Sequence, residues 1–211
     1  YHRFDVQGML ADQTLSELVE KVEQHPNIRV LANAVCNAWF ADNYLPVIQG
    51  NRMFKIRAKQ CVVASGAFEQ HVVFHNNDIP GVMMSSAAMR LMKHYAVKPG
   101  DKAIMLTGND DGYLAAIEMA KNGVTVPLIV DMRRQGAEAS LQAAAKALGI
   151  HIKLQATVYE AIASSDKKHL AAVKVHTIAA PGEVAKDGVT IPCDLLCMSA
   201  GYMPAYQLLC Q

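Results

Sequence analysis

The pattern of apolar and polar positions between residues 103 and 131 predicts a strand, a helix and a second strand. The apolar run AIML leads into a turn that contains glycine, and a helix-like stretch then continues to Asn122-Gly123. A second apolar run, VTVPLIV, ends at Asp131. This order is typical of the βαβ unit of dinucleotide-binding proteins.

Before this unit the pattern predicts one helix followed by several strands. Residues 14–25 have helical periodicity, and Thr14 and Glu17 fit a capping box at the start of the helix. The segments expected to form strands are NIRVLANAV, CNAWFADNYLPVI, RMFKIRAKQ and KQCVVASGAFEQ, with a hairpin break at Gln49-Gly50-Asn51.

A helix is predicted over residues 85–97, with Ser85 or Ser86 as its N-cap. After Asp131 the pattern predicts a helix that ends at Gly149. Three strands are expected to follow, in IHIKLQATVYEAIAS, LAAVKVHTIA and GVTIPCDLLCMSAG. Mixed β structure, then βαβαβ, then a β meander favours an α/β protein with a largely parallel sheet.

The turn after the first strand of the βαβ unit lacks most of the expected glycines. Where a G-x-G-x-x-G motif belongs, the chain has Thr107-Gly108-Asn109-Asp110-Asp111-Gly112. Gly112 retains the role of packing helix on strand, whereas Thr107 and Asn109 replace the glycines of the tight turn and of the pyrophosphate approach. The two aspartates suit the helix dipole but repel a phosphate there.

Asp131 stands where an acidic residue would bind a ribose hydroxyl, and Arg133 or Arg134 could instead meet a ribose phosphate. The alternative is that Asp131 caps a strand-to-helix loop and the arginines are solvated. The candidate nucleotide contacts of this unit are Thr107, Gly108, Asn109, Gly112 and Asp131. The unit therefore reads as a Rossmann-like frame that packs but binds a dinucleotide poorly or not at all.

Composition narrows the class of protein. The chain has 211 residues, of which 52% are hydrophobic, and a formal net charge of +1, so a core can form and neither nucleic acid nor an anionic membrane is an expected partner. The five cysteines form no C-x-x-C pair and predict reduced thiols in a cytoplasmic protein. No membrane span or signal peptide is expected, and the opening YHRFDVQGML suggests a piece of a longer protein.

Two short stretches flank the βαβ unit and resemble a known fold. They are residues 61–69 (CVVASGAFE) and residues 193–204 (CDLLCMSAGYMP), and the first contains Ala64-Ser65-Gly66-Ala67, similar to an A-T-G-A turn. Together they resemble the returning strands of the flavoproteins that include the pyridine nucleotide-disulphide oxidoreductases. The resemblance implies an NAD(P)-type domain inserted into an FAD/NAD-binding-type domain.

Further ordered motifs resemble the alpha subunits of heterotetrameric sarcosine oxidases and the related opine, proline and cyanide-forming glycine dehydrogenase subunits. They are the N-D-x-P-G-x-M stretch at residues 77–83 and the T-x-N-D-x-x-Y turn at residues 107–113. His71 departs from the family, which commonly carries Arg there, so any contact made by that Arg is in doubt here.

The resemblance implies three segments: residues 1–80 as part of a first nucleotide-binding domain, residues 81–192 as a second domain with a degenerate glycine motif, and residues 193–211 as the return to the first. It also implies sarcosine demethylation in a complex with a beta subunit, and NAD or FAD held by the full-length protein. The chain alone is expected to bind no cofactor and to be inactive. Without the missing strand, the first-domain portion is expected to be poorly ordered or to pair with a neighbouring chain.

Candidate cofactor contacts in the flanking stretches are Ser65, Gly66, Ala67 and Gly201, with Val35 on a strand that in the family runs beside the adenine. Gly66 and Gly201 each follow an apolar strand, where a ligand can approach the backbone; ordinary strand-to-loop glycines are the alternative. His71 and His75 are separated by an extended segment and do not predict a metal site. No catalytic residue is expected in the chain.

Two other functions remain open from the sequence. One is an NAD(P)H-binding module of a reductase that uses Asp131 or Arg133 to read the ribose. The other is a structural interaction domain, which predicts no ligand but stabilisation by a partner chain.

Overall fold

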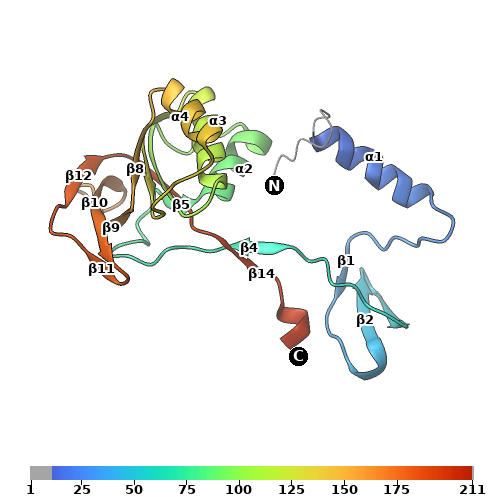
Figure 1. Ribbon diagram of the computed structural model, residues 1–211. Helices are drawn as coiled ribbons and strands as arrows, with labels where there is room; N and C mark the ends of the chain where they lie inside the picture. Colours follow the sequence, from blue (N-terminus) through green and yellow to red (C-terminus); the bar gives the residue numbers. More distant parts are fainter. Residues whose placement is uncertain (1–10, 211) are drawn as a thin grey trace. The chain divides into compact units, whose positions relative to one another are not determined.

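The structure is a computed structural model that describes residues 11–210, with side chains from residue 15 onward (Figure 1). The chain divides into two compact units. The first comprises Tyr1–Ala67 and Pro204–Gln211, and the second comprises Phe68–Met203. Among the described residues, no helix has the length and apolar character needed to cross a membrane.

The second unit is built on a five-stranded parallel sheet with the order β5-β13-β6-β7-β8 (Figure 1). In that order the strands are Val82–Met84, Leu195–Ser199, Lys102–Thr107, Thr125–Asp131 and His151–Leu154. The βαβ unit predicted at residues 103–131 is confirmed as β6, the helix α3 (Asp111–Lys121) and β7.

Alternate residues of the sheet pack against two different layers, because successive side chains of a strand point to opposite faces. Met105 and Ile129 lie in one core with residues of α3, of α2 (Ser85–Tyr95) and of α4 (Ala139–Ala147). Ile104 and Val130 lie in a second core with residues of the antiparallel strands. The parallel sheet is therefore buried on both faces, as such sheets require.

The second layer is an antiparallel sheet of β9 (Ala156–Ala163), β10 (Leu170–Ala180), β11 (Glu183–Val184) and β12 (Val189–Pro192). The segment expected as one strand at residues 150–164 is divided between the two sheets at Gln155, which has φ of 51°. This left-handed residue turns the chain out of the parallel sheet into the antiparallel one.

The segment at residues 188–201 is likewise two strands, β12 and β13, rather than one. All five residues of β13 are buried, and the strand lies between β5 and β6. The first compact unit resumes at Pro204. The second begins at Phe68, and within it His75 pairs with β9 and Pro80 accepts a hydrogen bond from Leu170 N–H.

The first unit contains the helix α1 (Ala11–Gln24) and the antiparallel order β1-β2-β3, made of Ala34–Cys36, Tyr44–Gln49 and Arg52–Arg57. A 3₁₀ helix at Ala41–Asn43 precedes β2, and the predicted hairpin turn at residues 50–51 is confirmed. Another 3₁₀ helix follows at Gln207–Cys210.

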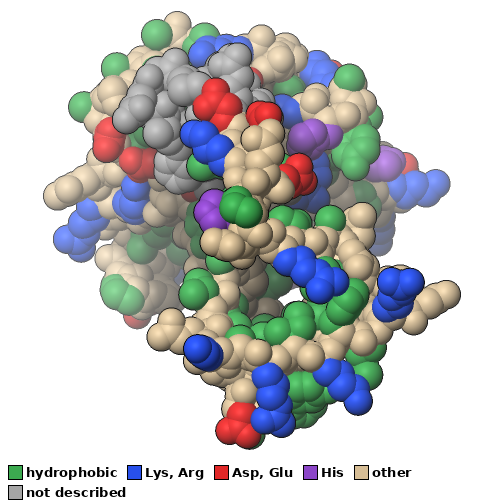
Figure 2. Space-filling view, turned by 90° about the vertical axis from the view of Figure 1, so that its right-hand side faces the viewer, with side chains coloured by type: hydrophobic (Ala, Val, Ile, Leu, Met, Phe, Trp, Pro, Cys, Tyr) green, Lys and Arg blue, Asp and Glu red, His purple; other side chains and the backbone are tan. Residues whose placement is uncertain are grey.

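Two strand predictions in the first unit are wrong. Residues 27–33 are not a strand, and only Ala34–Cys36 pairs. Residues 61–66 form no strand either, and Val62 is 88% exposed. An apolar run is held as a buried strand only when neighbours cover it, and the described residues supply no strand beside this one. Figure 2 shows hydrophobic side chains at the surface of one face of the molecule.

The two predicted helix N-caps are also wrong. The described part of α1 begins at Ala11, so Thr14 lies inside the helix. The helix α2 begins at Ser85, so its N-cap residue is Met84. The Met84 side chain makes no capping hydrogen bond. The acceptor comes instead from Glu69 in β4 (Ala67–Glu69), a strand paired with β14 (Tyr202–Pro204).

Candidate functional site

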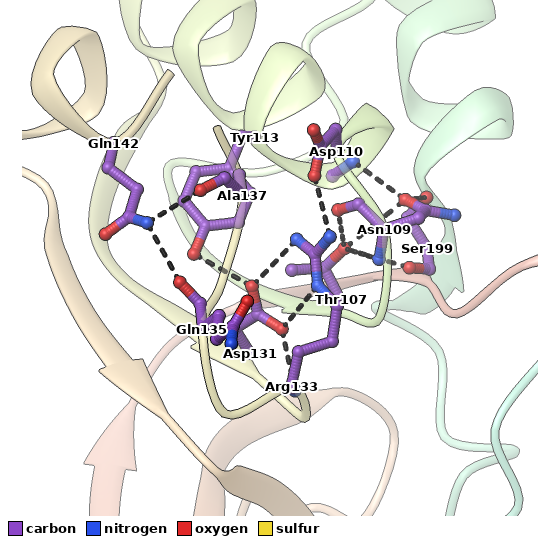
Figure 3. Close-up of polar contacts among 11 residues, drawn as sticks. Thr107, Asn109, Asp110, Tyr113, Asp131, Arg133, Gln135, Ala137, Gln142 and Ser199 are labelled. Carbon is purple, nitrogen blue, oxygen red and sulfur yellow. Dashed lines mark hydrogen bonds and ion pairs between the residues drawn. The ribbon is translucent and has the colours of Figure 1, made fainter. Parts of the chain in front are cut away.

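The turn between β6 and α3 lies at the carboxyl ends of the parallel strands, where open α/β sheets bind their ligands. Figure 3 shows its side chains directed toward one another and toward β7 and β13. The geometry of this turn decides whether the unit holds a dinucleotide.

Thr107 fills the position of the first motif glycine with a buried hydroxyl. Its Oγ1 lies 2.9 Å from Ser199 O and 2.8 Å from Asn109 O, and it accepts the Asn109 backbone N–H at 3.2 Å. The adjacent Gly108 donates its own N–H to Ser199 O at 2.9 Å. The turn is thus fastened to β13 by the side chain that replaced a glycine.

Asn109 occupies the position of the second motif glycine. Its Oδ1 accepts the backbone N–H of Gly112 at 3.2 Å and the hydroxyl of Ser199 at 3.0 Å (Figure 3). A pyrophosphate oxygen would need a donor of this kind at the helix N-terminus. The Asn109 Nδ2 is buried and has no hydrogen-bond partner among the described residues. The amide oxygen therefore stands where a phosphate oxygen would be held.

Gly112 has the packing role expected of the third glycine. A Cβ placed on Gly112 would lie 2.3 Å from Thr107 Oγ1 and 2.5 Å from Thr107 Cβ. The start of α3 can approach the end of β6 this closely only because residue 112 has no side chain.

Asp131 ends β7 with a carboxylate that is 0% exposed. Its Oδ1 accepts the backbone N–H of Arg133 at 2.9 Å and Arg133 Nε at 3.1 Å. Its Oδ2 accepts the Tyr113 hydroxyl at 2.9 Å and Arg133 Nη2 at 3.0 Å. A carboxylate has about four acceptor positions, and donors of this chain occupy them. Burial and the hydrogen bond to Asp131 raise the pKa of Tyr113.

Arg133 is paired with two carboxylates and is only partly exposed, whereas the alternative considered from the sequence had both arginines solvated. Its Nη1 donates to Asp110 Oδ1 at 2.7 Å, so the guanidinium joins the start of α3 to the end of β7. Arg134 is exposed. Asp111 accepts the Tyr202 hydroxyl at 2.8 Å, and burial together with this bond raises the pKa of Tyr202.

The candidate residues of the flanking stretches make fewer side-chain hydrogen bonds than those of the turn at residues 107–112. Gly66 has φ of +76°, and Gly201 has φ of +155°, and a Cβ at either would meet nothing within 4 Å. The Ser65 hydroxyl donates to Ala205 O at 2.8 Å, Ala67 begins β4, and Val35 lies in β1 with 61% of its surface exposed. Both glycines are required for their backbone angles rather than for space.

His75 Nδ1 lies 3.2 Å from Glu160 Oε1, and the described residues contain no group of three potential metal ligands. Ser199 and Tyr113 lie within the quoted stretches at residues 193–204 and 107–113, but the sequence analysis did not predict their contacts around the turn. Ser199 comes from a strand distant in the chain, and Tyr113 comes from the buried side of α3, so neither contact has a local signal.

The turn and the strand end do not fit a dinucleotide as they stand. The Gly112 N–H is taken by Asn109, the Asp131 carboxylate is saturated, and Asp110 and Asp111 add negative charge where phosphate would lie. The structure brings Thr107, Gly108, Asn109 and Gly112 together around Ser199 and joins Asp131 to them through Arg133.

A family model described as pyridine nucleotide-disulphide oxidoreductase matches residues 5–211. The chain therefore belongs to this family of oxidoreductases, which bind FAD and NAD(P). Its fold is the α/β, Rossmann-like FAD/NAD(P)-binding fold with a parallel sheet, as the sequence predicted.

The curated relatives are distant but cover most of the chain. Sarcosine oxidase subunit alpha of Rhizobium meliloti (strain 1021) is 30% identical over 97% of the chain, which spans 21% of that relative's length. The subunit of the same name from Corynebacterium sp. (strain U-96) is 30% identical over 76% of the chain and 16% of its own length. The chain thus spans about a fifth of the curated relatives it matches.

Solved structures share the fold. The thioredoxin reductase of T. acidophilum aligns with a TM-score of 0.71 and 15% identity over 95% of this chain and 62% of its own. The L-proline dehydrogenase of P. horikoshii aligns with a TM-score of 0.65 and 19% identity over 100% of this chain and 35% of its own.

Proposed function

We propose that the chain is an internal part of the alpha subunit of a cytoplasmic, flavin-dependent amine or amino-acid oxidase most similar to sarcosine oxidase. The similarity to sarcosine oxidase alpha subunits over 97% of the chain supports this proposal. The complete complex would demethylate sarcosine oxidatively to glycine, with a beta subunit as partner.

Within that subunit the second unit acts as a scaffold rather than a nucleotide site. The observation that carries this role is the saturation of Asp131 by Arg133 and Tyr113 inside the chain. A carboxylate whose acceptor positions are filled has none left for a ribose hydroxyl. No residue of this chain is assigned a catalytic role, and NAD or FAD belongs to the full-length protein, with Gly66 and Gly201 as backbone contacts.

A second candidate is an NAD(P)H-binding module of a reductase. The retained frame of β6, α3, β7, α4 and β8 favours it, because this frame is the one that binds dinucleotides in doubly wound sheets. The closed turn at residues 107–112 weighs against it.

A thermal-shift titration of the chain with NAD, NADP, their reduced forms and FAD separates the two. A scaffold gives no shift with any of them. Binding at a hundredfold excess over Kd would stabilise the folded chain by about 2.7 kcal/mol, enough to raise the midpoint by several degrees. A shift with one nicotinamide nucleotide would favour the reductase module.

A further inference from the structure

The guanidinium of Arg133 bridges the two elements that flank the ligand crevice of this fold. Toward β7 it makes a two-pronged contact with Asp131, through Nε at 3.1 Å and Nη2 at 3.0 Å. Toward α3 its Nη1 contacts Asp110 at 2.7 Å (Figure 3). Three of its donors are therefore used to join the end of β7 to the start of α3, the helix that precedes β7 in the chain.

The bridge replaces the contacts that a nucleotide would make there. In a dinucleotide-binding unit the acid at the end of the second strand accepts hydrogen bonds from the ribose, and the helix start faces the pyrophosphate. Here the Arg133 guanidinium donates one hydrogen bond to each oxygen of Asp131, and Asn109 Oδ1 accepts the Gly112 N–H. Side chains of the chain itself thus make the contacts that a nucleotide makes at these two places in a dinucleotide-binding unit.

We propose that Arg133 is an internal latch that closes the crevice at the ends of β6 and β7 to adenine dinucleotides. This inference rests on the proposed scaffold function, and it assigns to Arg133 the reason why the second unit would not bind a dinucleotide. The side chains of Thr107 and Asn109 leave less room in the turn than glycines would. Arg133 is a separate obstacle, because it would still occupy the Asp131 carboxylate in a variant that has glycine at position 109.

The test reopens the turn and then removes the latch. Asn109→Gly restores the second motif glycine and leaves Arg133 in place. Asn109→Gly/Arg133→Ser also removes the latch, and Asn109→Gly/Arg134→Ser is its matched control, because it removes the same charge from the exposed neighbour. Binding of ADP-ribose and NAD⁺ is measured by calorimetry, with folding checked by circular dichroism.

The latch predicts that Asn109→Gly/Arg133→Ser binds ADP-ribose at least about tenfold tighter than the Arg134→Ser control. Equal affinities, or no binding by either folded variant, would overturn it. Should Asn109→Gly/Arg133→Ser fail to fold, Asn109→Gly/Arg133→Lys is compared with Asn109→Gly/Arg134→Lys. Lysine keeps the charge but cannot donate to both Asp131 oxygens and to Asp110 with the planar fork of arginine, so equal binding by this pair also overturns the latch.

The unaltered chain separates the latch from the proposed function. Nucleotide binding that Asp131→Asn leaves unchanged lies elsewhere and contradicts the scaffold function alone. Binding that Asp131→Asn abolishes means that the crevice is open, and it overturns the latch.

Discussion

Thr107 and Gly112 are in such close contact that a Cβ on Gly112 would lie 2.3 Å from the Thr107 hydroxyl oxygen. The two positions are the first and third of the glycine motif, and one carries a side chain only because the other does not. The frame thus retains the glycine that packs the helix while using the first position for hydrogen bonds to β13.

Gly112→Ala is expected to destabilise the second unit by about 1–3 kcal/mol, the usual cost of overpacking a buried contact. Thr107→Gly in the same chain removes the atoms that the new methyl would meet, and it is expected to recover part of this loss despite its lost hydrogen bonds. Chemical denaturation of the two single variants and the double variant gives the coupling free energy between positions 107 and 112. Additive losses would show that the two residues do not limit each other.

Arg133→Gln is expected to cost roughly 2–3 kcal/mol, near the lower end for breaking a buried pair because the Arg133 side chain is 31% exposed. The reason is that Asp131, which is 0% exposed, keeps its charge but loses the guanidinium. Asp131→Asn/Arg133→Gln leaves no buried unpaired charge, because the remaining partner Asp110 is partly exposed, and it should be more stable than Arg133→Gln alone. Arg134→Gln, at the exposed neighbour, is the control and should change stability by less than about 0.5 kcal/mol.

Cys193 and Cys197 are expected to react with a thiol reagent much more slowly than Cys210. Burial, with a smaller contribution from Asp194, raises the pKa of Cys193 to about 12, and burial also raises the pKa of Cys197. Cys210 is exposed. At pH 8 the reactive thiolate of Cys193 should be depleted roughly a thousandfold relative to an ordinary thiol.

Ellman titration checks this before and after unfolding. Cys193 and Cys197 should react only in denaturant, and Cys210→Ser should remove one rapidly reacting thiol from the folded chain. Rapid labelling of Cys197 in the folded chain would contradict the burial of β13 in the middle of the sheet.

The periodicity of the sequence was sufficient to predict the βαβ frame, because a buried parallel strand and an amphipathic helix leave distinct patterns. It was insufficient at Gln155 and at Asp194, where one apolar run continues from one sheet into another. An alternating or continuous apolar pattern indicates that a strand is buried, but it does not indicate which sheet the strand joins. The central position of β13 therefore had no signal in the local sequence.

The site shows the same division between local and distant information. The missing glycines were visible in the motif itself. The closure by Arg133 was not, because its partner Asp110 is 23 residues away and the contact depends on how β7 and α3 pack. The strand predicted at residues 61–66 is wrong for a related reason. Its apolar composition is typical of a buried strand, but a strand forms there only if other segments pair with it, and the local sequence does not record whether they do.

Glu69 is expected to stabilise the start of α2. Its Oε1 accepts the Ser85 hydroxyl at 2.7 Å, and its Oε2 accepts the Ser86 hydroxyl at 2.6 Å and the Ser86 backbone N–H at 3.0 Å. Glu69→Ala should cost about 1–2 kcal/mol, as the loss of a helix cap does, and Glu69→Gln should cost less. The backbone amides in the first turn of α2 should also exchange their hydrogens faster in Glu69→Ala than in the unaltered chain.

Gln70→Ala is the control for that experiment, because the neighbouring Gln70 is exposed. Unchanged exchange at Ser86 in Glu69→Ala would mean that the carboxylate does not cap the helix.

Asp187 is expected to make stability depend on pH in the acid range. The hydroxyl of Thr177 donates to Asp187 Oδ2 at 2.5 Å and its backbone N–H donates to Oδ1 at 3.0 Å. These bonds, with a smaller contribution from Lys153, hold the pKa of Asp187 below its ordinary value of 3.8. Because the folded pKa is the lower one, the stabilisation is complete above the ordinary value and is lost as the pH falls through the folded pKa.

The stability difference between the unaltered chain and Asp187→Asn should therefore be present at pH 7 and shrink below about pH 4, the range in which an unperturbed aspartate is protonated. Thr177→Val removes the hydroxyl and should raise the pKa of Asp187 toward 3.8, whereas Thr177→Ser should leave it low. Carboxyl NMR titration measures both variants directly. Equal pKa values for Asp187 in Thr177→Val and Thr177→Ser would show that the hydroxyl is not the main cause of the shift.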